Sequence, residues 1–464
     1  MATSTRPPTR AVETLEQALR GELIRPDDTR YDDARRLYNA MIDKRPALIA
    51  RCVDVADTIA CVRFAAAEGI DLAVRCGGHN GGGLGSVDGG LVIDLSRLRG
   101  VRVDTGTRTV TVAGGTTLGE VDHATHPFGL AVPAGIISTT GVGGLTLGGG
   151  IGHLTRKHGL SIDNLVGADV VLADGTLVRA SECEHEDLFW ALRGGGGNFG
   201  VVTSFTFRAH PAAAVVAGPM LWPLEQAGEI LPFYAEFMAG APDEQNGFFA
   251  FLTVPPAPPF PEELYLRRVC GVVWCYAGDA DVAAASLAPI REQLPPAFDG
   301  VGEVPLPALQ SAFDGLYPPG DQWYWRADFV DEIPPAAVDA HLEHGAALPS
   351  WKSTMHLYPI DGAAGRVAPD ATAWSYRRAR WAQVIVGVDP EPANAAAIRD
   401  WTVSYWDALH PFSAGGAYSN FLMDEGEDRV RASYGANYER LARIKAAYDP
   451  DNVFHVNQNI RPAA

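Results

Sequence analysis

Three glycine-rich segments in the first half of the 464-residue chain constrain its fold more than any other feature. The first, residues 73–85, follows an apolar run and places one imidazole, that of His79, among closely spaced glycines. Glycine lets a backbone fold tightly and bring bare N–H groups against a ligand. We therefore expect this loop to cradle a bound group, with His79 held against that group.

The second segment, residues 133–152, combines glycines with the hydroxyl residues Ser138, Thr139 and Thr140. Backbone N–H groups and hydroxyls are what a pyrophosphate and the edge of an isoalloxazine ring both need. We interpret the bound group as a flavin and His79 as its covalent attachment point. The alternative for a lone loop histidine is a solvated turn residue.

The third segment contains the pattern G-x-G-x-x-G at Gly195, Gly197 and Gly200. A dinucleotide-binding fingerprint requires a helix after this pattern, with the pyrophosphate at its N-terminus. Residues 201–207 instead alternate with period two and are β-branched or aromatic at most positions, which predicts a strand. A Rossmann fold is therefore excluded.

Taken together, these motifs resemble those of the berberine-bridge-enzyme-like flavoprotein oxidases, in the vanillyl-alcohol oxidase and p-cresol methylhydroxylase superfamily. The similarity is greatest to bacterial members such as the 6-hydroxy-D-nicotine oxidases and the oxidases of aromatic polyketide biosynthesis. The matching segments cover almost the whole chain and are residues 45–52, 74–80, 90–96, 141–164, 187–203, 434–441 and 448–454. The resemblance implies an FAD-dependent oxidase, in which a hydride passes from a substrate C–H bond to the flavin and dioxygen leaves as hydrogen peroxide.

The expected fold class is α+β. The resemblance and the change of composition near residue 211 divide the chain into an FAD-binding domain at residues 1–210, with its core at about 44–210, a substrate-binding domain at 211–411, and a C-terminal segment at 412–464 that returns to the FAD domain. The FAD domain is of the two-part p-cresol methylhydroxylase type, and the substrate domain is an antiparallel sheet with helices on one face.

The hydrophobic pattern predicts individual elements as well. Apolar residues spaced by three and four from Val12 to Leu23, and again over residues 31–42, predict a helical lead-in over residues 12–45. A further helix is expected at residues 54–68. Strands are expected at residues 91–95, 109–112, 168–173, 269–276, 354–360 and 382–388.

The expected cofactor is FAD, joined to the protein by a single bond from His79. Many plant relatives carry a second bond from a cysteine at the position of Ile137, and isoleucine cannot form it. Cys76, three residues before His79, is interpreted as a small packing residue. The resemblance and the glycine segments together assign the FAD-binding residues as His79, Arg75, Gly77, Gly78, Asn80, Gly81, Gly135, Ser138, Thr139, Gly141, Gly144, Gly150, Asn164, Gly200, Val201, Val202, Asn457 and Asn459.

Four residues are candidates on the catalytic side of the flavin, and all four come from the resemblance. Thr140 matches the position that controls the access of oxygen to the reduced flavin in the family. The alternative is a threonine whose hydroxyl only forms a hydrogen bond with a nearby backbone group. Tyr418, Asn420 and Tyr358 offer a hydroxyl or an amide that could orient or deprotonate a substrate, or merely form a hydrogen-bonded wall.

Two further residues are candidates if none of those four is the catalytic base. His356 shares a strand face with Tyr358, because side chains alternate along a strand, and Asp361 lies just beyond the same strand. Relatives with a tyrosine after the asparagine have Phe421 here, which argues against a tyrosine pair.

Two clusters have open interpretations. Trp323, Tyr324 and Trp325 either line an apolar pocket for a ring-bearing substrate or belong to an ordinary core. His123 and His126 have a spacing that a helix can use for metal, but they lack a third ligand and are followed by a proline, so we expect a helix end and no metal. The proline-rich residues 255–261 predict a rigid surface loop.

Composition limits the classes of molecule that the protein can bind. The net charge is −19 and the positive residues are dispersed, which argues against nucleic acid and anionic membranes. No apolar run approaches the length of a membrane span, and the six cysteines form no C-x-x-C pair. We expect a cytoplasmic monomer or homodimer acting on a small-molecule substrate and O2. The alternatives are a flavin dehydrogenase, an oxygen-inserting enzyme of secondary metabolism, or a catalytically silent flavin-binding protein.

Overall fold

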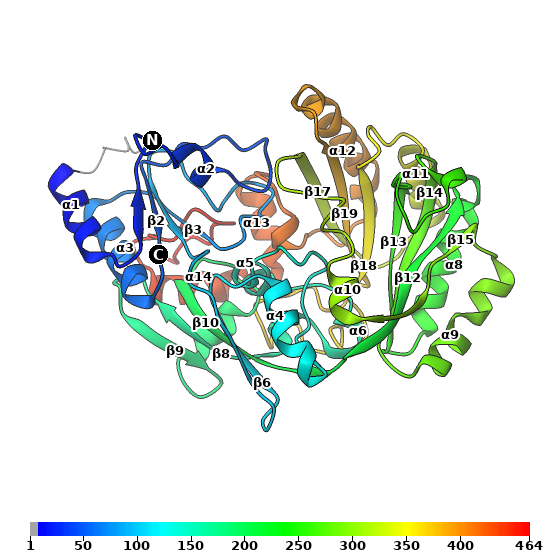
Figure 1. Ribbon diagram of the computed structural model, residues 1–464, viewed down its shortest axis with the longest axis horizontal. Coiled ribbons are helices and arrows are strands. Elements are labelled where there is room, and N and C mark those ends of the chain that lie inside the picture. Colours follow the sequence, from blue (N-terminus) through cyan, green and yellow to red (C-terminus); the bar gives the residue numbers. More distant parts are fainter. Residues whose placement is uncertain (1–7) are drawn as a thin grey trace.

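Two lobes lie side by side in the computed structural model, which describes residues 8–464 (Figure 1). One lobe carries both ends of the described chain and contains a small sheet beside a larger antiparallel one. In the small sheet, β2, β4 and β3 are parallel and β1 is antiparallel to β2. Its strands, in spatial order, are β1 (Glu22–Ile24), β2 (Leu48–Arg51), β4 (Leu91–Asp94) and β3 (Leu72–Arg75).

The larger sheet of this lobe is antiparallel throughout and is accompanied by a two-stranded ribbon. Its strands, in spatial order, are β5 (Val101–Asp104), β6 (Thr109–Ala113), β10 (Val201–Arg208), β8 (Leu165–Val171) and β9 (Leu177–Ser181); the ribbon joins β11 (His210–Pro211) to β7 (Leu130–Ala131). Because β10 begins directly after Gly200, the strand predicted behind the third glycine segment is confirmed.

Helices surround these two sheets and include the last two of the chain. They are α1 (Thr9–Ala18), α2 (Tyr31–Arg35), α3 (Val55–Glu68), α4 (Leu118–Thr125), α5 (Val142–Gly148), α6 (Thr155–His158), α7 (Glu186–Leu192), α13 (Glu427–Tyr434) and α14 (Tyr438–Tyr448). The predicted helix at residues 54–68 is confirmed as α3, because the Asp54 side chain caps the N–H of Asp57 and Gly69 ends the helix in a left-handed conformation.

The predicted helical lead-in over residues 12–45 is wrong beyond its first turns. Leu19 ends α1, Leu23 lies in β1, and only the first turn of the 31–42 segment is helical. The backbone N–H of Tyr38 donates to Gly78 and that of Ala40 donates to Asp321. These long-range bonds take backbone groups that a helix would have used internally, so the segment runs irregularly toward the other lobe.

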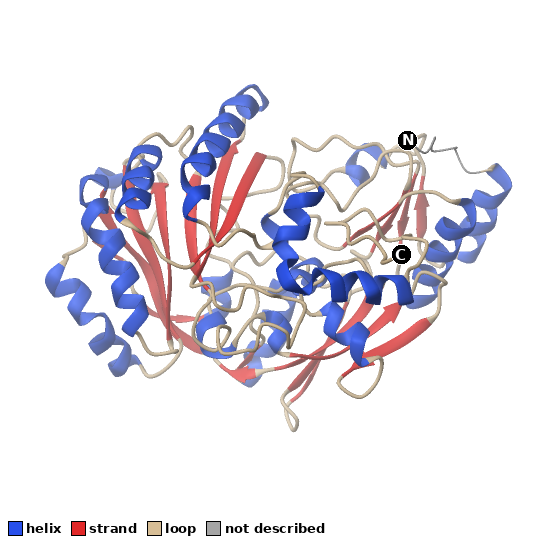
Figure 2. Ribbon diagram, turned by 180° about the vertical axis from the view of Figure 1, so that it is seen from behind, coloured by secondary structure: helices blue, strands red, loops and turns tan. Residues whose placement is uncertain are grey.

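The second lobe is built on one eight-stranded antiparallel sheet. Its strands, in spatial order, are β15 (Phe298–Asp299), β12 (Ala214–Pro223), β14 (Arg268–Tyr276), β13 (Gln245–Thr253), β18 (Thr354–Pro359), β19 (Trp381–Asp389) and β17 (Gln322–Val330), with β16 (Gly302–Pro305) paired to β12. Four helices cover its outer face (Figure 2). They are α8 (Ala227–Gly240), α9 (Ala280–Gln293), α11 (Pro335–Gly345) and α12 (Ala395–Leu409); α10 (Leu306–Gln310) packs instead near α4.

Successive side chains along each strand of this sheet point to opposite faces. On β13, Phe249 and Phe251 pack into the core beneath the helices, whereas Phe248 and Ala250 face the opposite way, toward the first lobe. One face of the sheet therefore packs against the helices, and the other face can line a site between the lobes. The α+β prediction of an antiparallel sheet with helices on one face is confirmed.

Short 3₁₀ turns connect the elements: η1 (His126–Phe128), η2 (Ser161–Asp163), η3 (Leu224–Gln226), η4 (Glu262–Leu264), η5 (Pro392–Asn394), η6 (His410–Phe412), η7 (Ser419–Phe421) and η8 (Gly435–Asn437).

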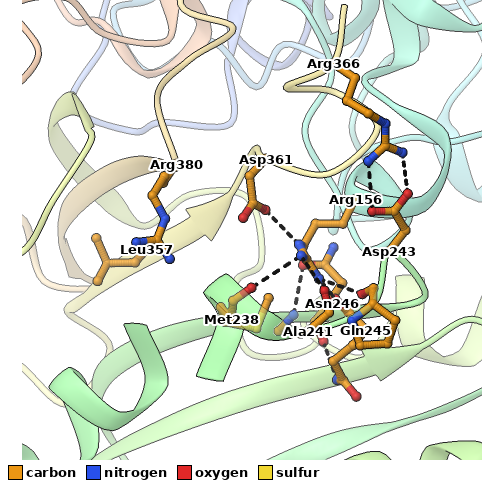
Figure 3. A network of polar contacts seen from close by, with 12 residues as sticks. Arg156, Met238, Ala241, Asp243, Gln245, Asn246, Leu357, Asp361, Arg366 and Arg380 are labelled. Carbon is orange, nitrogen blue, oxygen red and sulfur yellow. Dashed lines mark hydrogen bonds and ion pairs between the residues drawn. The ribbon is translucent and has the colours of Figure 1, made fainter. Parts of the chain in front are cut away.

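A buried arginine on α6 fixes the first lobe to the second (Figure 3). The Nε atom of Arg156 lies 2.7 Å from Oδ1 of Asp361, and its Nη atoms donate to carbonyl oxygens at the end of α8 and the start of β13, among them Pro242 at 2.8 Å and Ala241 at 3.2 Å. Asp361, considered on the sequence as a reserve catalytic group, is thus held in this ion pair. Breaking one partner of a buried pair is costly, so the contact locks the relative position of the lobes.

Candidate active site

A cavity of about 960 Å³ separates the two lobes. Its wall on the first lobe comes from all three glycine segments, and its wall on the second lobe is the free face of the large sheet. Residues far apart in sequence, such as His79, Gly144, Gly200 and Tyr358, therefore open onto one space. Cavities of this size, apolar with a few convergent polar groups, are where proteins bind cofactors and substrates.

His79 is held at the rim of the first glycine loop by three neighbours. Its Nε2 atom lies 3.0 Å from Oγ1 of Thr139 and its Nδ1 atom 3.5 Å from Oγ1 of Thr140. The ring of Tyr38 stacks on the imidazole with 3.9 Å between centroids. Burial lowers the pKa of His79 to about 4, so the ring is neutral at neutral pH and keeps a lone pair for bonding.

The first two glycine segments touch back to back. A Cβ atom on Gly77 would lie 2.5 Å from the backbone nitrogen of Gly141, and one on Gly141 would lie 2.3 Å from Sγ of Cys76. Only glycine allows this approach. Cys76 lies directly beneath, and burial raises the pKa of its thiol to about 11, which agrees with a packing residue and not with a reactive thiolate.

The loop suits a pyrophosphate and a flavin. Among residues 8–464, no acceptor is found for the backbone N–H groups of Gly78, His79 and Asn80, which line the cavity, so these donors are available to a ligand. Space beside Gly144 is open, since a Cβ there would meet nothing within 4 Å. Donor N–H groups in a glycine loop bind anionic oxygens, and the open flank leaves room for a ring system.

Arg75 supports the loop from below. Its Nη2 atom lies 2.6 Å from Oδ2 of Asp94 and donates to the carbonyl of Ala34 at 2.7 Å. Burial alone would raise the pKa of Asp94, but the charge and hydrogen bond of Arg75 bring it below the usual value. Arg75 lines the cavity, and its guanidinium is already paired, so its contribution is to hold the loop in place.

Most of the residues predicted to bind FAD line the cavity, and a minority do not. Those that line it are His79, Arg75, Gly77, Gly78, Asn80, Gly135, Gly141, Gly144, Gly200, Val201, Val202 and Asn457. Those outside the lining are Gly81, Ser138, Thr139, Gly150, Asn164 and Asn459.

Two of the residues outside the lining, Ser138 and Asn164, are hydrogen-bonded to other parts of the protein. The backbone N–H of Ser138 donates to Asp314, and its hydroxyl binds the same carboxylate. Asn164 donates to two carbonyl groups and its Oδ1 lies 2.6 Å from Nε2 of His210. Both side chains are therefore occupied by the protein, which leaves them little capacity for a cofactor. Thr139 differs, since it contacts His79 directly.

On the sheet side of the cavity, Tyr358 and His356 form a hydrogen-bonded pair. They lie two residues apart on β18, as strand alternation predicted, with 2.6 Å between the tyrosine oxygen and Nδ1 of the histidine. Burial raises the pKa of Tyr358 well above its usual value and lowers that of His356 to about 3. The histidine is therefore neutral, and its Nδ1 atom can accept a hydrogen bond from the tyrosine hydroxyl.

Tyr418 and Asn420 form a different arrangement at η7. The hydroxyl of Tyr418 accepts hydrogen bonds from the backbone N–H of Gly150 at 3.0 Å and from Nδ2 of Asn420 at 2.8 Å. The same Nδ2 also lies 3.2 Å from the carbonyls of Gly144 and Leu145. Burial raises the pKa of Tyr418 to about 12. Both residues line the cavity, and their polar groups tie η7 to α5.

The aromatic cluster on β17 divides between the two interpretations that the sequence left open. Trp323 and Trp325 line the cavity, whereas Tyr324 between them points to the other face, where Arg326 packs over its ring. The predicted surface loop at residues 255–261 is exposed at residues 256–259, and residues 255–260 also form one edge of the cavity.

The site contains two residues that no sequence pattern indicated. Tyr38 stacks on His79, and neighbouring Asn39 joins the glycine loop to the sheet. The Nδ2 atom of Asn39 donates to Gly81 at 2.8 Å and to Trp323 at 3.0 Å, and its Oδ1 accepts from the N–H of Trp323. No motif marks these positions, because their partners are distant in the sequence; those of Asn39 lie 42 and 284 residues away.

No group of three or more His, Cys, Asp or Glu side chains that could hold a metal ion is present within residues 8–464. His123 lies on α4, while His126 follows the end of that helix and begins η1. No helix in the described part of the chain is long and apolar enough to cross a membrane.

Comparison with known proteins agrees with this geometry. Residues 46–181, which contain the first two glycine segments, match the model of the FAD binding domain, and residues 417–461 match that of the berberine and berberine-like domain. An FAD-linked oxidoreductase of Dictyostelium discoideum is 30% identical over 461 residues, covering 98% of this chain and 97% of the relative. The chain belongs to the berberine-bridge-enzyme-like FAD-linked oxidoreductases. Its cofactor is FAD, and the predicted resemblance is confirmed.

Other members of the family are similar over their whole length. The (R)-6-hydroxynicotine oxidase of Paenarthrobacter nicotinovorans is 30% identical, covering 96% of this chain and 97% of that protein. Among solved structures, 6-hydroxy-D-nicotine oxidase from Arthrobacter nicotinovorans superposes with a TM-score of 0.86 at 26% identity, covering 96% of this chain and 98% of that one. Xylooligosaccharide oxidase from Myceliophthora thermophila, in complex with xylobiose, gives 0.85 at 26% identity and covers 98% and 99%. The p-cresol methylhydroxylase type of FAD-binding fold is therefore confirmed.

Proposed function

We propose that this FAD-linked oxidoreductase is an oxidase that carries FAD on a single covalent bond to His79. One observation supports it best. The cavity brings a neutral imidazole and free glycine-loop N–H groups to one wall, and a hydrogen-bonded tyrosine–histidine pair to the opposite wall. When bound there, FAD accepts a hydride from a substrate C–H bond and passes the electrons to dioxygen, which leaves as hydrogen peroxide.

The proposed attachment depends on which nitrogen of His79 is free. If Nε2 carries the proton and donates to Thr139, the lone pair on Nδ1 is available to bond, and its contact with Thr140 is only 3.5 Å. Tyr38 keeps the ring from turning by stacking on its face. Because position 137 is isoleucine, a second bond is not part of the proposal.

The proposed proton path uses Tyr358 and His356. As the hydride leaves the substrate, its hydroxyl proton passes to the oxygen of Tyr358, and the tyrosine proton passes to Nδ1 of His356. Burial raises the pKa of Tyr358 and lowers that of His356, so the proposed transfer rests on the 2.6 Å contact, which lets both protons move as the hydride leaves. Tyr418 and Asn420, whose polar groups are engaged with α5, are assigned to shaping and orienting the site.

The proposed oxygen-control residue is Thr140, which lines the cavity beside His79. Several relatives are named oxidases, which supports dioxygen as the electron acceptor. A dehydrogenase, an oxygen-inserting enzyme and a silent flavin protein are the alternatives. Anaerobic bleaching of the yellow enzyme by a substrate, followed by recolouring in air with one hydrogen peroxide per turnover, tests the proposal; bleaching without recolouring identifies a dehydrogenase.

The remaining expectations stay predictions from the sequence. They are the domain boundaries at residues 210 and 411, the full set of FAD-binding residues, a cytoplasmic location and a monomeric or homodimeric state. Each has a direct measurement, respectively limited proteolysis, a structure with FAD bound, fractionation of the source cells and light scattering.

A further inference from the structure

The chemistry of the cavity wall carries information about the substrate. Within the described chain, no Asp or Glu lines the cavity. Its two cationic residues, Arg75 and Lys352, are each paired with a buried carboxylate, Asp94 at 2.6 Å and Asp321 at 2.6 Å. The wall therefore offers no uncompensated charge to a ligand. Burying an ionised group without a partner is expensive, which disfavours a protonated amine.

Free polar groups on the sheet wall lie on two strands. On β18 the hydroxyl of Thr354 donates to the carbonyl of Phe251 at 2.8 Å, so Tyr358 and His356 supply the polar atoms of that strand. On β17 the indole N–H groups of Trp323 and Trp325 have no partner in the part of the chain that the structure describes and can each donate one hydrogen bond. The neighbouring strands present mainly aliphatic and aromatic side chains to the cavity, namely Phe248, Ala250, Leu252, Val273, Val384, Val386, Trp323 and Trp325. A sugar would bury several hydroxyls against this wall without partners, at a cost for each.

The cavity is also long. It is lined by residues of β12, β14, β13, β18, β19 and β17, six neighbouring strands of the sheet. At 4.7–4.9 Å per strand spacing, this corresponds to roughly 24 Å. One end lies at Trp325 near the glycine loop, and the other is bordered by Leu221, Leu252 and the loop ending in Phe260. The far end is apolar, so it suits a hydrophobic extension of the substrate beyond the reacting group.

We propose that the substrate is an extended, neutral, multi-ring aromatic alcohol or phenol, with its hydroxyl at Tyr358 and His356 and its remaining rings running along the sheet toward Phe260. This inference rests on the proposed oxidase function and adds the substrate class. It sets the chain apart from relatives named as oligosaccharide oxidases, since the wall described here has few groups to satisfy sugar hydroxyls.

The test compares four probes on the holoenzyme: 2-anthracenemethanol, benzyl alcohol, benzylamine and cellobiose. Anaerobic flavin bleaching gives rates, and perturbation of the flavin absorbance gives dissociation constants. We expect kcat/KM for 2-anthracenemethanol to exceed that for benzyl alcohol by about tenfold or more, because added apolar groups in such a pocket change specificity by that order. Equal or weaker binding of 2-anthracenemethanol contradicts the inference whether or not the flavin is reduced.

Filling the far half of the cavity tests the direction in which the substrate lies. Leu252 lines the cavity from β13 and packs in one cluster with Phe260, and Leu252→Trp should lower the preference for 2-anthracenemethanol over benzyl alcohol by about tenfold. Leu221→Trp, on β12 in the same cluster, makes the same test if the first variant does not fold. Val282→Phe adds bulk on the exposed side of α9 and should leave the preference unchanged. An unchanged preference in both cavity variants contradicts the inference.

The two proposals fail in different ways. Rapid bleaching by cellobiose or benzylamine, with recolouring in air, overturns the substrate class while supporting an oxidase. Tight binding of 2-anthracenemethanol with no bleaching by any probe supports the substrate class and counts against the oxidase.

Discussion

The hydroxyl oxygen of Tyr358 lies 2.6 Å from Nδ1 of His356, two residues earlier on the same strand. The strand repeat brings the two side chains to one face, and burial keeps the imidazole neutral by lowering its pKa to about 3. A tyrosine can accept a substrate proton efficiently only if its own proton has somewhere to go. The pair provides that acceptor within the cavity wall.

Tyr358→Phe should slow anaerobic flavin reduction by about 10²–10⁴-fold, because general acid–base assistance is worth that much. The flavin spectrum and the reaction of reduced flavin with oxygen should stay normal. Stopped-flow absorbance measures both half-reactions. Tyr418→Phe and Asn420→Ala are the comparison variants and should show smaller losses, mainly in substrate binding. If all three variants reduce within a few fold of wild type, the proton acceptor lies elsewhere.

His79→Ala should yield protein whose flavin is lost on acid precipitation, whereas the wild-type pellet should stay yellow. The reason is that the neutral imidazole, with its pKa lowered to about 4, is the proposed attachment point. Absorbance of the pellet and mass spectrometry of the flavin peptide measure the bond. Cys76→Ser is the matched control and should keep the flavin attached. A colourless wild-type pellet with free FAD in the supernatant refutes the tether, and two attachment points refute the single bond.

Thr140→Val keeps nearly the same side-chain shape and removes one hydroxyl. Flavin loading and substrate reduction should survive, and the rate constant for the reaction of reduced flavin with oxygen should change severalfold. Mixing photoreduced enzyme with oxygenated buffer measures that rate. Thr140→Ser, which keeps the hydroxyl, is the control. Oxygen kinetics indistinguishable from wild type in the valine variant would reduce Thr140 to a packing residue.

Asp122 makes stability depend on pH. It is buried on α4 within a hydrophobic core, and burial raises the pKa of its carboxyl to about 7, above its value in an unfolded chain. Between about pH 4 and pH 7 the folded state holds a proton that the unfolded state has lost, so stability falls as pH rises. Asp122→Asn should flatten this slope and raise the unfolding free energy at pH 8 by about 2–4 kcal/mol. Urea unfolding at pH 5 and pH 8 measures the difference; an equal slope in wild type and variant counts against the assignment.

The sequence by itself determined those features of this protein that depend on neighbouring residues. Glycine segments whose spacing matches a family indicated FAD, and the strand after Gly200 excluded a Rossmann fold, because alternation and glycine content are properties of neighbouring residues. The helix at residues 54–68 was predictable for the same reason, since its cap residues Asp54 and Gly69 lie at its own ends. The shared face of His356 and Tyr358 followed from the strand repeat.

Only the tertiary structure decided what long-range contacts control. The periodicity of residues 31–42 predicts a helix. In the structure, however, the side chain of Asn39 donates hydrogen bonds to Gly81 and Trp323, and the ring of Tyr38 stacks on His79. Asp361 is equally suited to catalysis by its type and position in the sequence, and the structure pairs it with Arg156 instead. The size and neutrality of the cavity also arise only when the two lobes meet. Hydrogen bonds and ion pairs between residues tens or hundreds of positions apart leave no periodic trace in the chain, which is why local patterns do not reveal them.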